Sequence, residues 1–260
     1  MTQLVGALCE NRTKVILVSD RMVSTSDGSL AFEHEPKFVI VSSNALVLTA
    51  GTIHEPELIE DVCTNGRIPL REIADNLSSS YRRIRKKRVE EEVLSPFGFL
   101  SYEDYYDKNR GLNEDMNFRI GKQIAEYELG IELILGGVDQ KAHLYRICEP
   151  GTYKSFDELG FCTVGSGDMH SAPVFAFYEF KPVLSASDTL QIAYEAKKRA
   201  EMAGGVGNET DAWIISKEGC YEIAQETIQA IDEFRKERST SVQFRREFEI
   251  KTRRVECETS

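Results

Sequence analysis

Thr2 is the residue whose type and position most directly suggest a nucleophile. A hydroxyl group is a weak nucleophile until a neighbouring base activates it. Removal of Met1 would leave Thr2 with a free α-amine, which supplies such a base within the same residue. The unperturbed pKa of an α-amine is about 8, so a neutral fraction is present at physiological pH. The alternative is that Thr2 simply begins a strand. The residues around Thr2 are needed to choose between a catalytic and a structural role.

Five short motifs could build a site around this threonine. They occur in the order TQLVG at 2–6, VILVSDR at 15–21, EPKFVI at 35–40, AGT at 50–52 and VGSG at 164–167. Each motif alone also fits a strand end or a turn, so a single one carries little weight. Five of them in a fixed order are more specific than any one.

In order and spacing, these motifs resemble the proteasome β subunits, a family of N-terminal nucleophile hydrolases. The separation of Lys37 from Gly51 equals the family spacing, and the 164–167 motif matches three positions of the Gly-Ser-Gly-Ser signature. The resemblance covers nearly the whole chain, except for an insertion at about 90–128 and a basic, flexible tail at about 239–260. It implies one domain over 1–260 of the α+β class, a four-layer αββα sandwich of two antiparallel sheets covered by helices.

The resemblance also implies a role for each matching residue. Thr2 Oγ would attack a scissile carbonyl while the α-amine takes its proton. The Lys37 ammonium would lower the pKa of both groups, and Asp20 would hold that ammonium through a charge-assisted hydrogen bond. The Gly51 N–H would stabilise the oxyanion, and Ser166 would join the hydrogen bonds around the amine. Each could instead serve a plain structural purpose, as a surface charge or a turn residue.

The sequence departs from the family pattern at two places. Ala200 and Ala203 stand where the family has Asp and Ser, and Asp168 occupies the fourth position of the Gly-Ser-Gly-Ser motif. We hypothesise that Asp168 or Glu201 supplies the missing negative charge.

Substrate preference is only weakly readable from the sequence. Val23, Glu35 and Thr49 match positions near the specificity pocket of the family, and Glu35 favours basic side chains. The aromatic-rich insertion is expected to cap the site or to form a partner surface.

Three functions remain open. The first is a threonine peptidase that cleaves peptides or unfolded chains within a homo-oligomer, such as a ring. The second is an amidase or transpeptidase that passes the acyl group to an amine. The third is an inactive structural subunit that keeps the fold alone. The resemblance implies no cofactor.

The order of elements agrees with an α+β fold. Hairpins are predicted at 2–9 with 14–19, 38–41 with 45–50, and 211–216 with 220–223, with further strands at 129–135, 142–147 and 160–164. Helices are predicted at 57–63, 70–88, 171–177, 187–203 and from 227 onwards. Residues 94–127 are expected to be irregular, with at most a short helix. Strands grouped with strands suggest packed sheets covered by helices.

Composition excludes several classes of protein. A net charge of −11 argues against a general nucleic-acid binder. No apolar run approaches the roughly 20 residues that cross a bilayer, and the start lacks a signal-peptide pattern, so a cytoplasmic protein with reduced cysteines is expected. The four histidines are far apart and lack HExxH spacing, so no metal site is expected.

Overall fold

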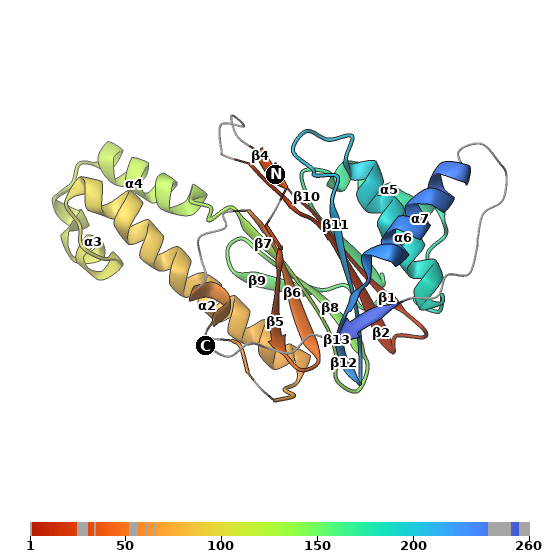
Figure 1. Ribbon diagram of the computed structural model, residues 1–260. Coiled ribbons are helices and arrows are strands. Elements are labelled where there is room, and N and C mark those ends of the chain that lie inside the picture. The colour runs from red at the N-terminus through yellow and green to blue at the C-terminus, as the bar shows by residue number, and fades with distance from the viewer. Residues whose placement is uncertain are drawn as a thin grey trace.

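The computed structural model describes residues 2–24, 31–33, 35–51, 57–60, 62–64, 66–238 and 251–254. Two large antiparallel sheets and a set of helices place the chain in the α+β class, as the sequence predicts (Figure 1). A short hairpin of β3 (Met22–Ser24) and β4 (Ala31–Glu33) forms a separate two-stranded sheet, which the sequence analysis did not anticipate.

The first sheet contains the N-terminal strand that carries Thr2. Its strand order is β10-β1-β2-β11-β12-β13, and every pairing is antiparallel. The strands are β1 (Gln3–Cys9), β2 (Lys14–Asp20), β10 (Phe161–Gly165), β11 (Thr210–Ser216), β12 (Gly219–Ile223) and β13 (Thr252–Arg254). The predicted hairpins at 2–19 and 211–223 are confirmed.

The second sheet carries Lys37 just before its edge strand. Its strand order is β5-β6-β7-β8-β9, again antiparallel throughout. The strands are β5 (Phe38–Ser42), β6 (Ala45–Gly51), β7 (Ile131–Val138), β8 (Ala142–Cys148) and β9 (Thr152–Ser155). Strand β9 was missed because its short run TYKS is largely exposed and shows no apolar pattern.

The two sheets pack face to face through an apolar layer. Because side chains alternate along a strand, Leu4 and Leu8 of β1 face the second sheet, whereas Val5 and Ala7 face helices. Gly136 of β7 contributes to this close packing, since a Cβ there would lie 3.0 Å from the Leu17 side chain.

Helices cover the outer faces of both sheets. Helices α5 (Asp168–Phe177), α6 (Ala186–Ala200) and α7 (Gln225–Arg238) share a core with the first sheet. Helices α1 (Glu57–Glu60) and α2 (Leu70–Val89) pack on the second sheet. Ser185 caps α6, because its Oγ accepts a hydrogen bond from the backbone N–H of Asp188 at 3.0 Å.

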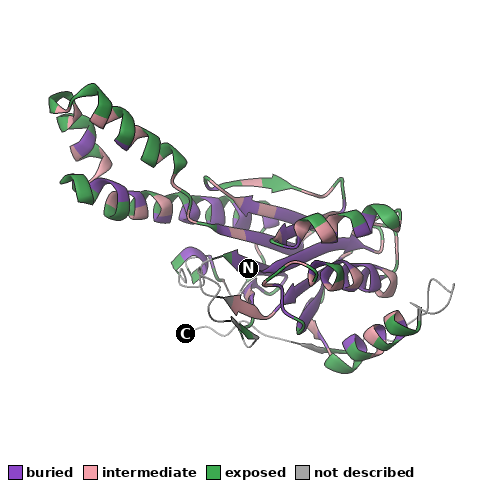
Figure 2. Ribbon diagram, turned by 90° about the horizontal axis from the view of Figure 1, so that it is seen from above, coloured by how far each residue is buried: buried purple, intermediate pink, exposed green. Residues whose placement is uncertain are grey.

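The expectation of an irregular insertion at 94–127 is wrong. A π-helical turn (Glu90–Leu94) and short 3₁₀ turns (Ser95–Phe97 and Asn109–Gly111) connect α2 to α3 (Tyr102–Lys108) and α4 (Glu114–Glu126). These elements form an arm that projects away from both sheets (Figures 1 and 2). The arm has a small core of its own, made by Leu94, Phe99, Tyr105 and Ile120.

The arm helices are specified by local signals. Ser101 and Asn113 cap α3 and α4, accepting hydrogen bonds from the backbone N–H groups of Asp104 and Met116. Apolar residues in α4 recur at Met116, Ile120 and Ile124, which is the spacing of one helical face.

We predict that Gly121→Ala stabilises the arm. Gly121 lies inside α4, and a Cβ there would meet nothing within 4 Å. Alanine loses less backbone entropy than glycine on forming a helix, so the free energy of unfolding should rise by about 0.5–1 kcal/mol in urea titration. Gly137→Ala in β7 is the opposing control and should lower the free energy of unfolding, because its Cβ would lie 2.7 Å from the Asn44 carbonyl oxygen. A loss of stability in Gly121→Ala would contradict the helical assignment of this segment.

The C-terminal region is more ordered than the expected flexible tail in one place. Thr252–Arg254 form β13, which pairs with β12 at the edge of the first sheet. Residues 239–250 and 255–260 lie outside the described residues. Among the helices that the structure describes, none has the length and apolar content needed to cross a bilayer.

Candidate active site

Three residues predicted to act together meet at one end of the two sheets. Thr2 precedes β1, Asp20 ends β2 and Lys37 precedes β5. Lys37 Nζ donates a hydrogen bond to Thr2 Oγ1 at 2.7 Å and another to Asp20 Oδ1 at 2.7 Å. Asp20 is fully buried, and Thr2 and Lys37 are each 6% exposed. The structure thus brings the three residues together, while their catalytic roles stay predictions.

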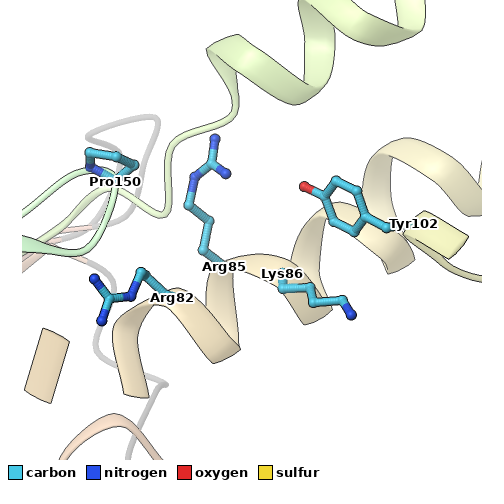
Figure 3. Close-up of a pocket in the computed structure, with 5 residues that line it drawn as sticks. All are labelled: Arg82, Arg85, Lys86, Tyr102 and Pro150. Carbon is cyan, nitrogen blue, oxygen red and sulfur yellow. The ribbon is translucent and has the colours of Figure 1, made fainter. Parts of the chain in front are cut away.

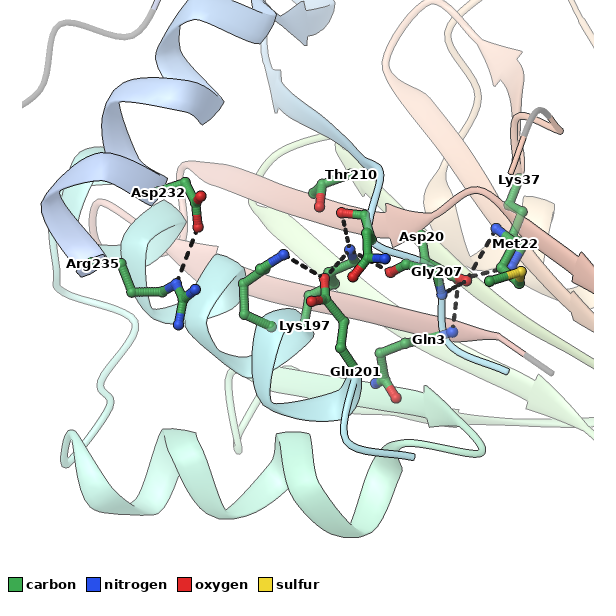
Figure 4. Close-up of polar contacts among 12 residues, drawn as sticks. Gln3, Asp20, Met22, Lys37, Lys197, Glu201, Gly207, Thr210, Asp232 and Arg235 are labelled. Atoms are coloured by element: carbon green, nitrogen blue, oxygen red, sulfur yellow. Dashed lines mark hydrogen bonds and ion pairs between the residues drawn. The ribbon is translucent and has the colours of Figure 1, made fainter. Parts of the chain in front are cut away.

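The Asp20 carboxylate is held from several directions. Besides Lys37, its Oδ1 accepts the backbone N–H of Gln3 at 2.8 Å. Its Oδ2 accepts the backbone N–H groups of Gly207 at 3.0 Å and Met22 at 3.2 Å (Figure 4). Donors aimed at a carboxylate favour its charged form, which offsets the cost of burying it. These backbone donors could not be predicted, because any residue type can supply them.

The charge state of Lys37 depends on Asp20. Burial lowers the pKa of Lys37, and the charge and hydrogen bond of Asp20 oppose that shift. Asp20 therefore favours the charged form of a lysine whose Nζ lies 2.7 Å from the Thr2 hydroxyl. Such an arrangement lowers the pKa of a nearby amine or hydroxyl group.

Gly165 and Ser166 bring β10 against Thr2. The Ser166 N–H donates to the Thr2 carbonyl at 3.1 Å, and Gly165 pairs with Gln3 across the strands. Gly165 has φ +123°, and a Cβ there would lie 1.9 Å from the Thr2 carbonyl oxygen, so only glycine fits. The predicted role of Ser166 around the α-amine stays a prediction.

Gly51 ends β6 near Lys37. The Thr49 N–H donates to the Lys37 carbonyl at 2.9 Å, which fixes the end of β6 beside the lysine. Gly51 has φ +104°, and a Cβ there would lie 1.8 Å from the Gly130 carbonyl oxygen. The backbone here therefore requires glycine, while its role as an oxyanion donor stays a prediction.

The two candidate acids, Asp168 and Glu201, both have other partners. The Asp168 carboxylate accepts a hydrogen bond from the Thr163 hydroxyl. Glu201 Oε1 lies 2.6 Å from Lys197 Nζ and 2.7 Å from Lys198 Nζ. Neither acid makes a hydrogen bond to Thr2 among the contacts that the structure describes, so their support of the amine stays a hypothesis.

The predicted specificity residues lie near the site with different exposure. Val23 of β3 and Thr49 of β6 are half-buried, and Glu35 is exposed. Thr52 of the AGT motif lies outside the described residues. Within the described part of the chain, no cluster of His, Cys, Asp or Glu side chains has the size of a metal site.

A separate pocket of about 420 Å³ lies between α2 and the arm, lined by Arg82, Arg85, Lys86, Tyr102 and Pro150 (Figure 3). Arg85 donates to the carbonyl oxygens of Ile124 and Tyr127, both at 2.9 Å. Lys86 Nζ lies 3.0 Å from Glu103 Oε1. These two cations therefore hold the arm on α2.

The sequence matches no protein-family model and no curated protein. The geometry around Thr2 consequently carries the functional argument.

Proposed function

We propose that this chain is a threonine-type N-terminal nucleophile peptidase that resembles a proteasome β subunit. The observation that carries the proposal is the buried chain of hydrogen bonds from Asp20 through Lys37 to the Thr2 hydroxyl. Removal of Met1 would expose the Thr2 α-amine and complete the site.

The reaction follows from the groups present. Thr2 Oγ1 attacks the carbonyl carbon of a peptide bond, and its proton passes to the neutral α-amine. The Lys37 ammonium stabilises the developing alkoxide, and the Gly51 N–H stabilises the oxyanion. The attack gives a tetrahedral intermediate. When it collapses, the α-amine returns its proton to the leaving nitrogen, the amine half of the substrate departs, and an ester remains on Thr2. Water then hydrolyses the ester and regenerates the hydroxyl.

A purely structural Lys37–Asp20 pair is the competing interpretation. Burying two charges costs several kcal/mol each, and well-packed apolar residues are often as stable or more so. A pair kept for stability has no need to direct its ammonium at a hydroxyl. Here the same ammonium contacts both Asp20 and Thr2, which favours a chemical role.

The arrangement of layers supports the same family proposal. The layers follow the order of an αββα sandwich, from α5 and α6 through the first sheet and the second sheet to α2. On the same resemblance, we propose peptides or unfolded chains as substrates, a homo-oligomeric assembly and a cytoplasmic location.

We expect an epoxyketone probe to form a covalent adduct on Thr2. Such a probe bridges a hydroxyl and a free α-amine on one residue, so its adduct reports both groups at once. Intact and N-terminal peptide mass spectrometry before and after treatment should show loss of Met1 and the adduct on Thr2. The substitution Thr2→Ala should abolish the adduct.

Two other outcomes are informative. Retention of Met1 with no adduct would contradict the proposal and favour a structural subunit. If the adduct forms, incubation with peptide and a free amine separates hydrolysis from acyl transfer to that amine.

A further inference from the structure

Helix α6 buries a lysine completely. Lys197 is 0% exposed, and its ammonium donates to Glu201 Oε1 at 2.6 Å and to the carbonyl oxygens of Gly207 at 2.7 Å and Asn208 at 2.9 Å. These contacts use all three donors of the ammonium. Fully buried lysines are rare because desolvation opposes the charge. The contacts of Lys197 therefore have to account for its presence.

The segment that Lys197 holds also contacts Asp20. The N–H of Gly207 donates to Asp20 Oδ2 at 3.0 Å, while the Gly207 carbonyl accepts from Lys197. Asp20 Oδ1 accepts from Lys37, which donates to Thr2. A continuous set of hydrogen bonds therefore runs from Lys197 of α6 through the Gly207 segment to Asp20 and Lys37 (Figure 4), and Lys37 in turn donates to Thr2.

The alternative is that Lys197 only caps the end of α6. A cation in the last turn does interact favourably with the helix dipole. Lys198 and Arg199 already supply cations to that turn, and both are more exposed than Lys197. Capping alone does not require burying Lys197 as well.

The two buried cations also interact with the same carboxylate. Burial lowers the pKa of Lys197, whereas Glu201 and, more weakly, the charge of Asp20 raise it. Lys197 thus lies within the electrostatic range of Asp20 although the two side chains share no hydrogen bond among the contacts described.

We propose that Lys197 is a positioning residue that orients Asp20 through the Gly207 segment and so keeps Lys37 on the Thr2 hydroxyl. This inference deepens the peptidase proposal and rests on it for its functional meaning. Its geometric content, that Lys197 controls the Asp20–Lys37 contact, can be measured without catalysis.

The test is a pH titration of the Lys37 ammonium by NMR in ¹⁵N-lysine-labelled protein, with the signal assigned from Lys37→Met. In Lys197→Met, Asp20 loses its fixed orientation and supports the Lys37 charge less well. Removal of the Lys197 charge by itself would raise the titration midpoint of Lys37, so the expected fall of about half a pH unit reports the lost orientation of Asp20. Lys198→Met is the matched control, because Lys198 contacts the same Glu201, whereas the described bonds to the Gly207 carbonyl come from Lys197. It should leave the midpoint unchanged.

Thermal unfolding shows whether each variant is folded. If Lys197→Met does not fold, Lys197→Gln replaces the three donors of the ammonium with the two of an amide on a shorter side chain, and should shift the midpoint in the same direction by a smaller amount. An unshifted Lys37 in a folded Lys197 variant, or an equal shift in Lys198→Met, overturns the inference.

Trapping of Thr2 by the epoxyketone separates the two proposals. With a reactive wild-type protein, Lys197→Met should slow trapping by about 10-fold or more and move the alkaline limb of its pH profile to lower pH. A wild-type protein that does not react, yet shows the Lys37 shift in Lys197→Met, would refute the peptidase proposal and support the positioning role.

Discussion

Lys37→Met is expected to slow covalent trapping of Thr2 by about 10²–10³-fold. The substitution removes the cation that donates to Thr2 Oγ1, and loss of one donor at an oxyanion site typically costs about 10²–10³ in rate. It also leaves Asp20 buried without its counter-ion, so the free energy of unfolding should fall by about 3 kcal/mol. The backbone donors to Asp20 remain and keep the loss at the low end of the usual range. Adduct formation over time and urea titration measure the two effects.

The matched control is Lys154→Met. Lys154 is an exposed lysine on β9, so its replacement removes the same charge from the chain without touching the site. Both rate and stability should stay close to wild type. Near-normal trapping in folded Lys37→Met would mean that Lys37 is a structural partner of Asp20 and takes no part in activating Thr2.

Gly165→Ala is expected to disrupt the site from the opposite strand. The new Cβ would lie 1.9 Å from the Thr2 carbonyl oxygen, and the φ of +123° is one that alanine rarely adopts. Either the β1–β10 pairing opens at Gln3 or the backbone of Thr2 moves. Misplacing a nucleophile by about 1 Å can cost about 10²-fold in rate, and we expect a loss of at least that size. The free energy of unfolding should fall by roughly 2–4 kcal/mol.

The control Gly98→Ala tests the cost of positive φ alone, without the clash that a Cβ at Gly165 would make with Thr2. Gly98 also has positive φ, at +83°, but a Cβ there would meet nothing within 4 Å, and it lies in the arm. It should cost about 1 kcal/mol and leave the trapping rate unchanged. If Gly165→Ala behaves like Gly98→Ala, the close contact between β10 and Thr2 does not constrain the nucleophile.

Local patterns were sufficient for most strands and helices. The short apolar run of β1 fits a strand buried on both faces, and the stripe of Ile73, Leu77, Tyr81 and Ile84 fits a helix buried on one face. The polar composition of 94–127 favours an irregular segment, although the signals that specify the helices of the arm are local. Asn113 as a cap and the recurrence of apolar residues in α4 were available in the sequence.

The sequence by itself determined that Thr2, Asp20 and Lys37 are the residues to examine, through motif order and the resemblance that follows from it. Only the tertiary structure decided that they touch and what supports them. Gly207 lies 187 positions from Asp20 in the chain, and its contribution is a backbone N–H that every residue except proline carries. Lys197 appears in the sequence as one more charge on a charged helix. Its desolvation arises only when α6 packs against the first sheet, because burial is a property of the assembled layers.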